Sequence, residues 1–592
     1  MPDQPNVPPS SAASAPSGPV APKPESPAPA APQPPKAPAG FVNVEIDGRP
    51  LQVKAGTNLI EAANQLDIRI PFYCYHKKLT IAANCRMCLV KVSNAPKLVP
   101  GCQTPVTEGL KVTTNSPEVM DSHRAVEELL LYNHPVDCAI CDQAGECKLQ
   151  DYYMQYDHRP QRPAQPKLLR HKRKELGPTI VLDQERCVLC TRCVRFMKEI
   201  PGEPQLGVFG RGNHEYIDIF PGQELTSRYA GNTVDICPVG ALLSRDFRFK
   251  ARAFYLSQAV SVCAGCSRGC NTFLDHYDQV SYRYRPREND AVNSAWMCDD
   301  GRLTYHRLVE KRALAPMLGR VGAGKPAAFA EAVATAAKRL EPFRGKAELA
   351  VLVSPQLSVE DLLAVAQLAK EALGASALYE GGLADGVEDA LLLRADKNPN
   401  RQGLRLVAKA FGLELRPFQE LVDAAEAGKL KALYVAGAEV PIDEHMAAAV
   451  LEPIEVIVTQ AVHLDGLAGG SDVLLPASPH AEDDGSFVNF EGRLQRFERA
   501  YAPWGESRPH WALATELARA LGFTWRRASA RAVWDELRDR IPEFAQVDWS
   551  DLGPNAIRRP GIGLAPAAAD ARPPGYRERP VQLKARPPEP IQ

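Results

Sequence analysis

All fifteen cysteines of this 592-residue chain lie between Cys74 and Cys298, and none follows Cys298. Disulfide frameworks are typical of short chains that carry an export signal. This chain is long, and its first 39 residues are dominated by Pro, Ala and Ser and contain no Arg, which fits neither a signal peptide nor an arginine-rich transit peptide. The cysteines are therefore predicted to bind metal in a reducing compartment.

The first set of candidate ligands has the spacing C-x10-C-x2-C-x13-C and consists of Cys74, Cys85, Cys88 and Cys102. Four thiolates suit a 2Fe-2S cluster, and the long gaps let a loop wrap the cluster while the last cysteine reaches in from a later segment. A structural zinc site usually has two C-x2-C-like pairs, and this set has only one. The first set is therefore predicted to hold a 2Fe-2S cluster.

The second set has the spacing H-x3-C-x2-C-x5-C and consists of His134, Cys138, Cys141 and Cys147. Its three thiolates leave a 4Fe-4S cluster one ligand short unless the histidine is the fourth. Neutral imidazole in place of a thiolate makes the site less negative, so ligand identity and solvent exposure are expected to tune its reduction potential. We predict a 4Fe-4S cluster with one histidine ligand.

The third set is a triplet of cysteines at three-residue steps followed by a distant Cys-Pro pair, and it consists of Cys187, Cys190, Cys193 and Cys237. This is the bacterial ferredoxin arrangement for a 4Fe-4S cubane, and zinc sites seldom use such a triplet. Because no second triplet stands beside Cys237, one cluster is expected here rather than two.

The fourth set, C-x2-C-x3-C-x27-C, again offers four thiolates to a 4Fe-4S cluster and consists of Cys263, Cys266, Cys270 and Cys298. With it, fifteen cysteines and one histidine fill four tetrads without remainder, and no thiol is left for nucleophilic catalysis. Neither H-E-x-x-H nor G-x-S-x-G occurs, and no complete catalytic site is evident. The chain is expected to pass single electrons through one 2Fe-2S and three 4Fe-4S clusters, with the substrate chemistry in its partners.

Charge and hydropathy narrow the class of partner. Lys and Arg (70) nearly balance Asp and Glu (71), which argues against a nucleic-acid-binding face. No apolar stretch approaches the roughly 18 residues that indicate a membrane helix, so any link to a membrane is expected to go through other chains. A basic run with seven Lys and Arg between Arg159 and Lys174 is either a solvated linker or a docking site for an acidic partner.

The pattern of elements predicts a multidomain protein of α+β and α/β class. Residues 42–46 alternate, Asp47-Gly48 supplies a hairpin turn before a returning strand, and Thr57 is expected to cap a helix, which together suit a β-grasp ferredoxin. Residues 125–131 are expected to be helical. Beyond Cys298, Ala- and Leu-rich helices, one of them from Pro326, alternate with short apolar runs, as in an α/β domain. The runs are 349–353, 432–436, 455–459 and 473–475.

These observations divide the chain into seven predicted segments. The segments are a disordered Pro/Ala-rich tail at 1–39, a 2Fe-2S ferredoxin-like domain at 40–118, a 4Fe-4S domain with one histidine and three cysteine ligands at 119–158, a 4Fe-4S ferredoxin-like domain at 159–255, a further 4Fe-4S domain at 256–312, an α/β domain at 313–552 and a Pro-rich tail at 553–592.

Several motifs resemble the large iron-sulfur subunit of respiratory complex I, called the G subunit in bacteria. The resemblance covers residues 41 to about 310. The motifs are IPFYCYH at 70–76, NCRMCLV at 84–90, HPVDC at 134–138, GECKLQD at 145–151, RC at 186–187, CVRF at 193–196 and DICPVGAL at 235–242.

The resemblance implies an electron-transfer subunit of a proton-translocating NADH-quinone oxidoreductase. Electrons would pass from an NADH- and FMN-binding subunit to the first set, then to the third and the second sets, and onward through other peripheral-arm iron-sulfur subunits to the quinone-site subunits. The fourth set would lie off this path, and its presence indicates a bacterial protein, since mitochondrial relatives lack that cluster. The location implied is the cytoplasmic side of the bacterial inner membrane, as a peripheral part of a membrane-bound complex.

The fourth set and the region after it also resemble molybdopterin oxidoreductases, through SDVLLP at 471–476 and GSFVNFEGR at 485–493. No cysteine follows Cys298 to bind molybdenum, so this α/β domain is interpreted as a reduced remnant. The rival functions are an NAD-linked molybdenum formate dehydrogenase, an iron hydrogenase, which would need further cysteines, and a zinc-stapled scaffold without redox activity.

Overall fold

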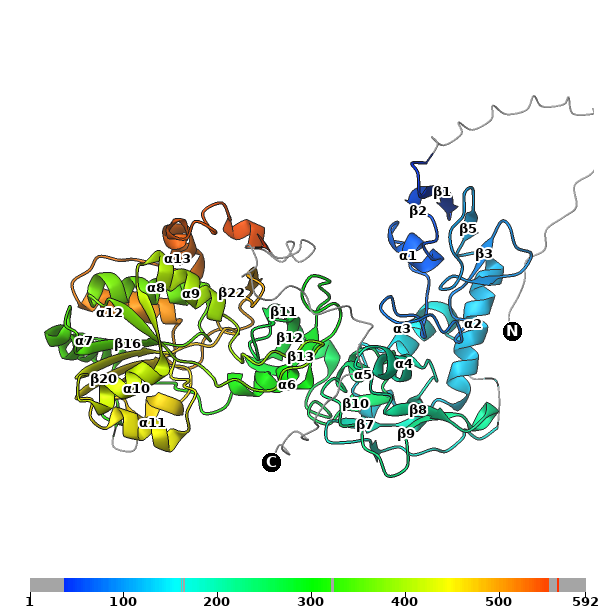
Figure 1. The fold of residues 1–592 in the computed structure, drawn as a ribbon. Helices are drawn as coiled ribbons and strands as arrows, with labels where there is room; N and C mark the ends of the chain where they lie inside the picture. Colours follow the sequence, from blue (N-terminus) through cyan, green and yellow to red (C-terminus); the bar gives the residue numbers. More distant parts are fainter. Residues whose placement is uncertain (1–36, 161, 163–164, 321–323, 553–561, 564–592) are drawn as a thin grey trace, which may run out of the picture.

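The computed structural model describes residues 37–160, 162, 165–320, 324–552 and 562–563. An amino-terminal lobe, a small three-stranded sheet and a carboxyl-terminal α/β lobe lie in a row (Figure 1). The tails predicted at 1–39 and 553–592 fall almost wholly outside the described residues. Within the described part of the chain, no helix is both long and apolar enough to cross a membrane.

A five-stranded sheet opens the amino-terminal lobe in the order β2-β1-β5-β3-β4. The predicted hairpin is confirmed, because Asp47 and Gly48 have φ of 49° and 78°, as a two-residue turn between twisted strands requires. Thr57 is not the helix cap: the side chain of Asn58 accepts the backbone N–H of Glu61 instead. The elements are β1 (Phe41–Ile46), β2 (Arg49–Lys54), α1 (Leu59–Asn64), β3 (Leu89–Val92), β4 (Val99–Pro100) and β5 (Lys111–Thr113).

Helices and loops carry the second and third sets. Helix α2 (Pro117–Asn133) contains the predicted helical stretch 125–131 and starts earlier, because the Ser116 side chain accepts the N–H of Val119 and proline suits the first helical turn. The remaining elements of this lobe are α3 (Lys148–Tyr152), β6 (Lys174–Glu175), β7 (Ile180–Leu182), α4 (Arg192–Glu199), β8 (Leu206–Phe209), β9 (Tyr216–Ile219), α5 (Asn232–Asp235) and β10 (Leu242–Ser244).

The central sheet carries the fourth set. Strands β11 (Ser257–Val262), β12 (Asn271–Tyr277) and β13 (Val280–Pro286) pair antiparallel, and α6 (Asp299–Leu303) follows. The first three cysteines of the set occupy the connection from β11 to β12, and the fourth is the N-cap of α6.

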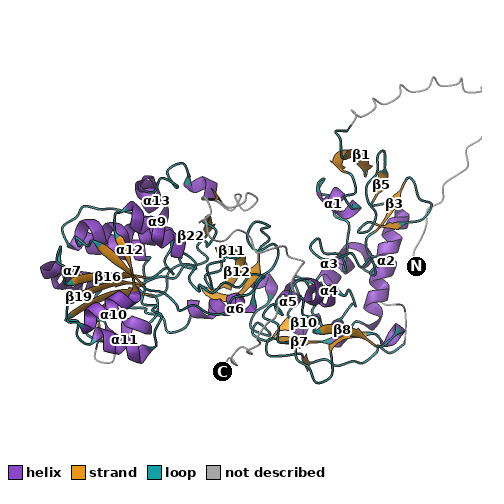
Figure 2. Ribbon diagram, in the orientation of Figure 1, coloured by secondary structure: helices purple, strands orange, loops and turns teal. Residues whose placement is uncertain are grey.

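The carboxyl-terminal lobe is an eight-stranded sheet in the order β15-β14-β21-β20-β19-β16-β17-β18, parallel from β21 to β18. Helices cover both faces (Figure 2). The α/β prediction is confirmed, but Pro326 lies in an edge strand rather than in the helix that was expected to begin there. The strands are β14 (Met317–Leu318), β15 (Lys325–Pro326), β16 (Leu349–Val353), β17 (Ala377–Glu380), β18 (Glu414–Pro417), β19 (Ala432–Ala436), β20 (Val456–Ala461) and β21 (Val473–Pro476).

Alternate residues of the central strand β16 enter the two hydrophobic cores of this lobe. Leu349, Val351 and Val353 face one core and Ala350 and Leu352 face the other, which explains why the strand reads as a continuous apolar run. The first core is covered by α7 (Phe329–Leu340), α8 (Val359–Gln367), α9 (Arg401–Ala410), α12 (His510–Ala520) and α13 (Ala530–Leu537). The second is covered by α10 (Phe418–Glu426) and α11 (Glu444–Leu451). A small sheet of β22 (Gly485–Val488), β23 (Arg493–Phe497) and β24 (Ile562–Gly563) completes the lobe.

Candidate metal centres

The cysteines of the first set meet because β3 and β4 pair. β3 begins directly after Cys88, β4 ends two residues before Cys102, and the two strands are antiparallel neighbours. The Cys88 thiol is hydrogen-bonded to that of Cys102, and the Cys74 thiol to those of Cys102 and Cys85. These hydrogen bonds lower the pKa of Cys74 and raise the pKa of Cys85 and Cys102, as expected of thiols that are crowded into one site.

The second set follows the end of α2. His134 is the first residue after the helix, and burial lowers its pKa to about 4, so the imidazole is neutral, as a metal ligand must be. Its Nδ1 accepts the N–H of Val136 at 3.1 Å, which leaves Nε2 to face a metal. Cys138 and Cys141 share a tight turn in which the Cys141 N–H donates to the Cys138 carbonyl at 3.2 Å. Burial raises the pKa of Cys147 to about 12, with a smaller contribution from Cys141 nearby.

The basic run folds over the second set. Lys167 Nζ donates to the His134 carbonyl oxygen at 2.5 Å, and Lys172 Nζ forms an ion pair with Asp137 at 2.8 Å. Burial disfavours the charge on Asp137, but hydrogen bonds from its basic partners outweigh burial and hold its pKa well below the usual range. The run is therefore a strap that pairs with its own chain, rather than only a solvated linker.

All four cysteines of the third set line one cavity. Leu189 and Thr191 have φ of 50° and 59°, so the backbone turns left-handed twice between the ligands before α4 begins. Burial raises the pKa of Cys187 to about 12 and that of Cys190 to about 11. Buried thiolates are costly without a cation beside them, so a cavity surrounded by four thiols fits a metal cluster.

The fourth set is buried at all four positions. The Cys263 N–H donates to the Cys270 carbonyl at 2.8 Å, which closes the loop between β11 and β12. Gly301 lies against the first and last cysteines of the set: a Cβ there would be 2.9 Å from Cys263 Sγ and 3.3 Å from Cys298 Sγ. The small residue therefore lets the thiols of two distant segments share one site.

Two contacts join the second and third sets, and sequence reasoning missed both. Arg186, the residue before Cys187, donates from Nε and Nη2 to the two carboxylate oxygens of Asp137 at 2.8 and 2.7 Å. A Cβ on Gly240 would lie 2.2 Å from Cys141 Sγ. Neither relation has a local sequence signal, because the partners lie far apart along the chain.

Among the described residues, no three His, Cys, Asp or Glu side chains converge closely enough to hold a single metal ion. An iron-sulfur cluster is wider than one ion, because several iron and sulfide atoms separate its thiolates. Thiols that surround a cavity, as those of the third set do, therefore fit a cluster better than a lone ion.

Comparison with known families finds iron-sulfur domain matches over the segments that contain the first three sets. Residues 40–117 match a 2Fe-2S iron-sulfur cluster binding domain, residues 124–162 the NADH-ubiquinone oxidoreductase-G iron-sulfur binding region, and residues 177–243 the ferredoxin-like domain of NADH-quinone oxidoreductase subunit 3. The NADH-quinone oxidoreductase G subunit of Rickettsia conorii is 28% identical over 86% of this chain and 92% of its own length.

Over most of its length the chain is similar to G subunits of NADH-quinone oxidoreductase. The NADH-ubiquinone oxidoreductase 75 kDa subunit of Reclinomonas americana is 37% identical over 57% of this chain, which spans about half (49%) of that protein. Among solved structures, a chain of an NAD+-reducing [NiFe]-hydrogenase aligns with 36% of this chain and 90% of its own length, at 24% identity and a TM-score of 0.31. The domain matches indicate 2Fe-2S and 4Fe-4S binding domains in this chain.

The α/β lobe contains a cavity, and residues 400–520 of this lobe match molybdopterin oxidoreductases. The cavity lies at the carboxyl ends of β16, β19, β20 and β21, where open α/β sheets bind ligands, and Ala264 of the fourth-set loop closes one side. Burial lowers the pKa of His480 to about 4 and raises that of Asp483 to about 7. Imidazoles and carboxylates line it, and no thiol is among the lining residues.

Proposed function

We propose that the chain carries one 2Fe-2S and three 4Fe-4S clusters and relays electrons within NADH-quinone oxidoreductase. The ligands are the four sets defined above, with His134 as the single imidazole. The observation that carries the proposal is the third set, in which four thiols spaced as in a bacterial ferredoxin line one buried cavity. When bound, such clusters supply one-electron carriers.

Arginine side chains link the segments of the first three sets, and these links support a relay because they hold the three segments against one another. Arg192, in the third-set helix α4, donates to the carbonyl oxygens of Ile236 at 3.0 Å and of Tyr75. Arg195 of the same helix donates to the carbonyl oxygen of Cys74 at 2.5 Å. The third set is thereby tied to the first, and the Arg186–Asp137 pair ties it to the second.

The proposed path enters at the first set, continues to the third and leaves from the second, and the fourth set lies off it. The proposed partners are an NADH- and FMN-binding subunit, the other peripheral-arm iron-sulfur subunits and the quinone-site subunits. The proposed location is the cytoplasmic side of the bacterial inner membrane, reached through these partners. The names of the relatives and the domain matches support a place in NADH-quinone oxidoreductase. The path, the partners and the location follow from the resemblance of the sequence motifs.

The experiment is a count of iron, acid-labile sulfide and molybdenum on anaerobically purified protein, with low-temperature EPR during stepwise reduction. We expect about fourteen iron atoms per chain, no molybdenum, and one 2Fe-2S and three 4Fe-4S signals. Stoichiometric molybdenum would favour a formate dehydrogenase-like catalytic subunit. A colourless protein loaded with zinc would favour the scaffold instead.

A further inference from the structure

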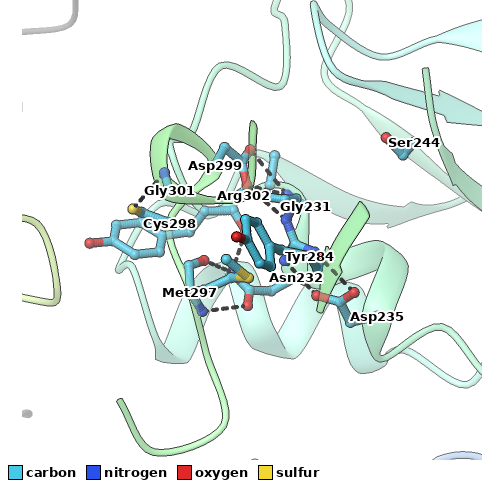
Figure 3. A network of polar contacts seen from close by, with 12 residues as sticks. Gly231, Asn232, Asp235, Ser244, Tyr284, Met297, Cys298, Asp299, Gly301 and Arg302 are labelled. Atoms are coloured by element: carbon cyan, nitrogen blue, oxygen red, sulfur yellow. Dashed lines mark hydrogen bonds and ion pairs between the residues drawn. The ribbon is translucent and has the colours of Figure 1, made fainter. Parts of the chain in front are cut away.

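The segment that leads into Cys237 is clamped against the segment that carries Cys298 (Figure 3). The Asn232 side chain satisfies both backbone groups of Met297: its Nδ2 donates to the Met297 carbonyl at 2.7 Å, and its Oδ1 accepts the Met297 N–H at 3.1 Å. Both carboxylate oxygens of Asp299 accept the Gly231 N–H, at 2.9 and 3.1 Å. These contacts hold residues 231–235, which precede Cys237, against residues 297–302, which include Cys298.

An ion pair completes this clamp. Arg302 Nη2 lies 2.5 Å from Asp235 Oδ2, and Arg302 Nη1 lies 3.1 Å from Asp235 Oδ1. The side chains are only 12% and 14% exposed. Arg302 Nη1 also donates to the Tyr284 carbonyl at 3.2 Å, which anchors it to β13. Asp235 stands two residues before Cys237, so the fourth-set segment places a cation beside a charge that adjoins the third set.

The charges of this pair matter because water screens them poorly. In a partly buried site, the field of an unpaired charge reaches further than at the surface. While both partners are present, their fields largely cancel at the third set. Asp299 Oδ1 also lies 3.8 Å from Arg302 Nε, so the cation stands between two carboxylates. Removing the cation therefore makes the charge beside Cys237 more negative, and removing the Asp235 carboxylate makes it less negative. Extra negative charge makes reduction of a cluster harder, and extra positive charge makes it easier.

We propose that Asp235 and Arg302 are positioning residues that set the reduction potential of the third cluster, with the cation supplied by the fourth-set segment. The fourth set thus affects the electron path electrostatically, without carrying electrons itself. The inference rests on the proposed function, because it takes Cys237 as a ligand of the third 4Fe-4S cluster.

The test is an EPR-monitored redox titration of the intact complex, with iron counted in every preparation. Arg302→Gln should lower the midpoint potential of the third cluster, Asp235→Asn should raise it, and Arg302→Lys, which keeps the charge, should leave it close to the parent value. The matched control is Asp300→Asn, which removes the more exposed carboxylate that pairs with Arg228 at 2.7 Å in the same segments. This control should not shift the potential.

The opposite signs separate an electrostatic role from a merely structural one. Shifts of the same sign in Arg302→Gln and Asp235→Asn, or no shift in either, would overturn the proposal. The double variant that carries both changes removes both charges and should return the potential towards the parent value, even where one single variant loses its cluster. Loss of iron from the double variant would also overturn the proposal, because the pair would then be a packing element. Absence of the third-cluster signal from the unmodified complex would instead contradict the proposed function.

Discussion

Arg186 and Asp137 form a two-bond ion pair between the residues that stand directly before Cys187 and Cys138. The Arg186 side chain is 4% exposed and the Asp137 side chain 19%. One contact therefore orients the first cysteine of the third set and the first cysteine of the second set.

Asp137→Asn should destabilise the second and third sets together. Removing the Asp137 charge leaves the buried guanidinium of Arg186 with Asp183, 3.3 Å from its Nε, as its remaining carboxylate partner, which costs up to about 3 kcal/mol. The measurement is the urea concentration at which visible cluster absorbance is lost. Lys172→Gln is the matched control: the Lys172 side chain is 44% exposed, so water screens its pairs with Asp137, Asp183 and Glu185, and each contributes about 1 kcal/mol or less. Equal effects of the two changes would contradict the prediction.

Gly240→Ala should remove the second cluster alone. The added Cβ would lie 2.2 Å from Cys141 Sγ, so the thiol must leave its position. We expect a loss of about four iron atoms per chain and of one 4Fe-4S EPR signal. Gly469→Ala is the control, since a Cβ at Gly469 meets nothing within 4 Å. Retention of every signal in Gly240→Ala would show that the loop relaxes without releasing its ligand.

Glu127→Gln should flatten the pH dependence of stability. Tyr73 donates a hydrogen bond of 2.5 Å to Glu127, and burial raises the pKa of this carboxyl from 4.5 to about 8, although that hydrogen bond lowers it. Between these two values the folded chain holds a proton that the unfolded chain has lost. The contribution of Glu127 to stability therefore falls as pH rises from about 4.5 to about 8, by about 1.4 kcal/mol per unit, and is constant above that window.

Glutamine is neutral throughout this pH range and can still accept from Tyr73. Urea unfolding of the anaerobic protein at several pH values measures the effect, and the variant should lose its slope and gain relative stability near pH 8. Glu128→Gln, the neighbouring change at a more exposed carboxylate, is the control. Parallel curves for Glu127→Gln and the parent would refute the shifted pKa.

Cys187→Ala should abolish electron flow from NADH to quinone, whereas Cys263→Ala should mainly weaken assembly or stability. The first change removes a ligand from the proposed path, and the second acts on the set placed off it. Activity of the assembled complex, normalised to its flavin content, measures the difference. Normal turnover in Cys187→Ala would exclude the path, and loss of turnover in a fully assembled Cys263→Ala complex would place the fourth set on it.

Features that depend only on residues close together in the chain could be predicted from the sequence. The hairpin at Asp47-Gly48 follows from turn chemistry and alternation, and the buried strand Leu349–Val353 from a short apolar run. The proposed ligand sets follow in the same way from the spacing of soft ligands, which sets how far a loop can wrap. The assignment of those ligands remains a prediction that iron counting and EPR will test.

Two errors show where local signals fail. Thr57 and Asn58 are both suitable caps, and only the path of the chain out of the hairpin decides that Asn58 meets the N–H of Glu61. Pro326 suits a first helical turn, but its segment pairs with β14, whose position depends on β21, contributed by residues far along the chain. At the boundary of an element, neighbouring residues have similar propensities to begin it, so tertiary contacts decide where the element starts.

By itself, the sequence determined the order of the candidate ligand sets, the fold class and the similarity to NADH-quinone oxidoreductase G subunits. Only the tertiary structure decided which charges and glycines join those segments: Asp137 with Arg186, Gly240 with Cys141, and Asp235 with Arg302. These partners are separated by roughly 50 to 100 residues, and pairing of that kind leaves no periodic or compositional trace, because its free energy appears only once the backbone has brought the two segments together.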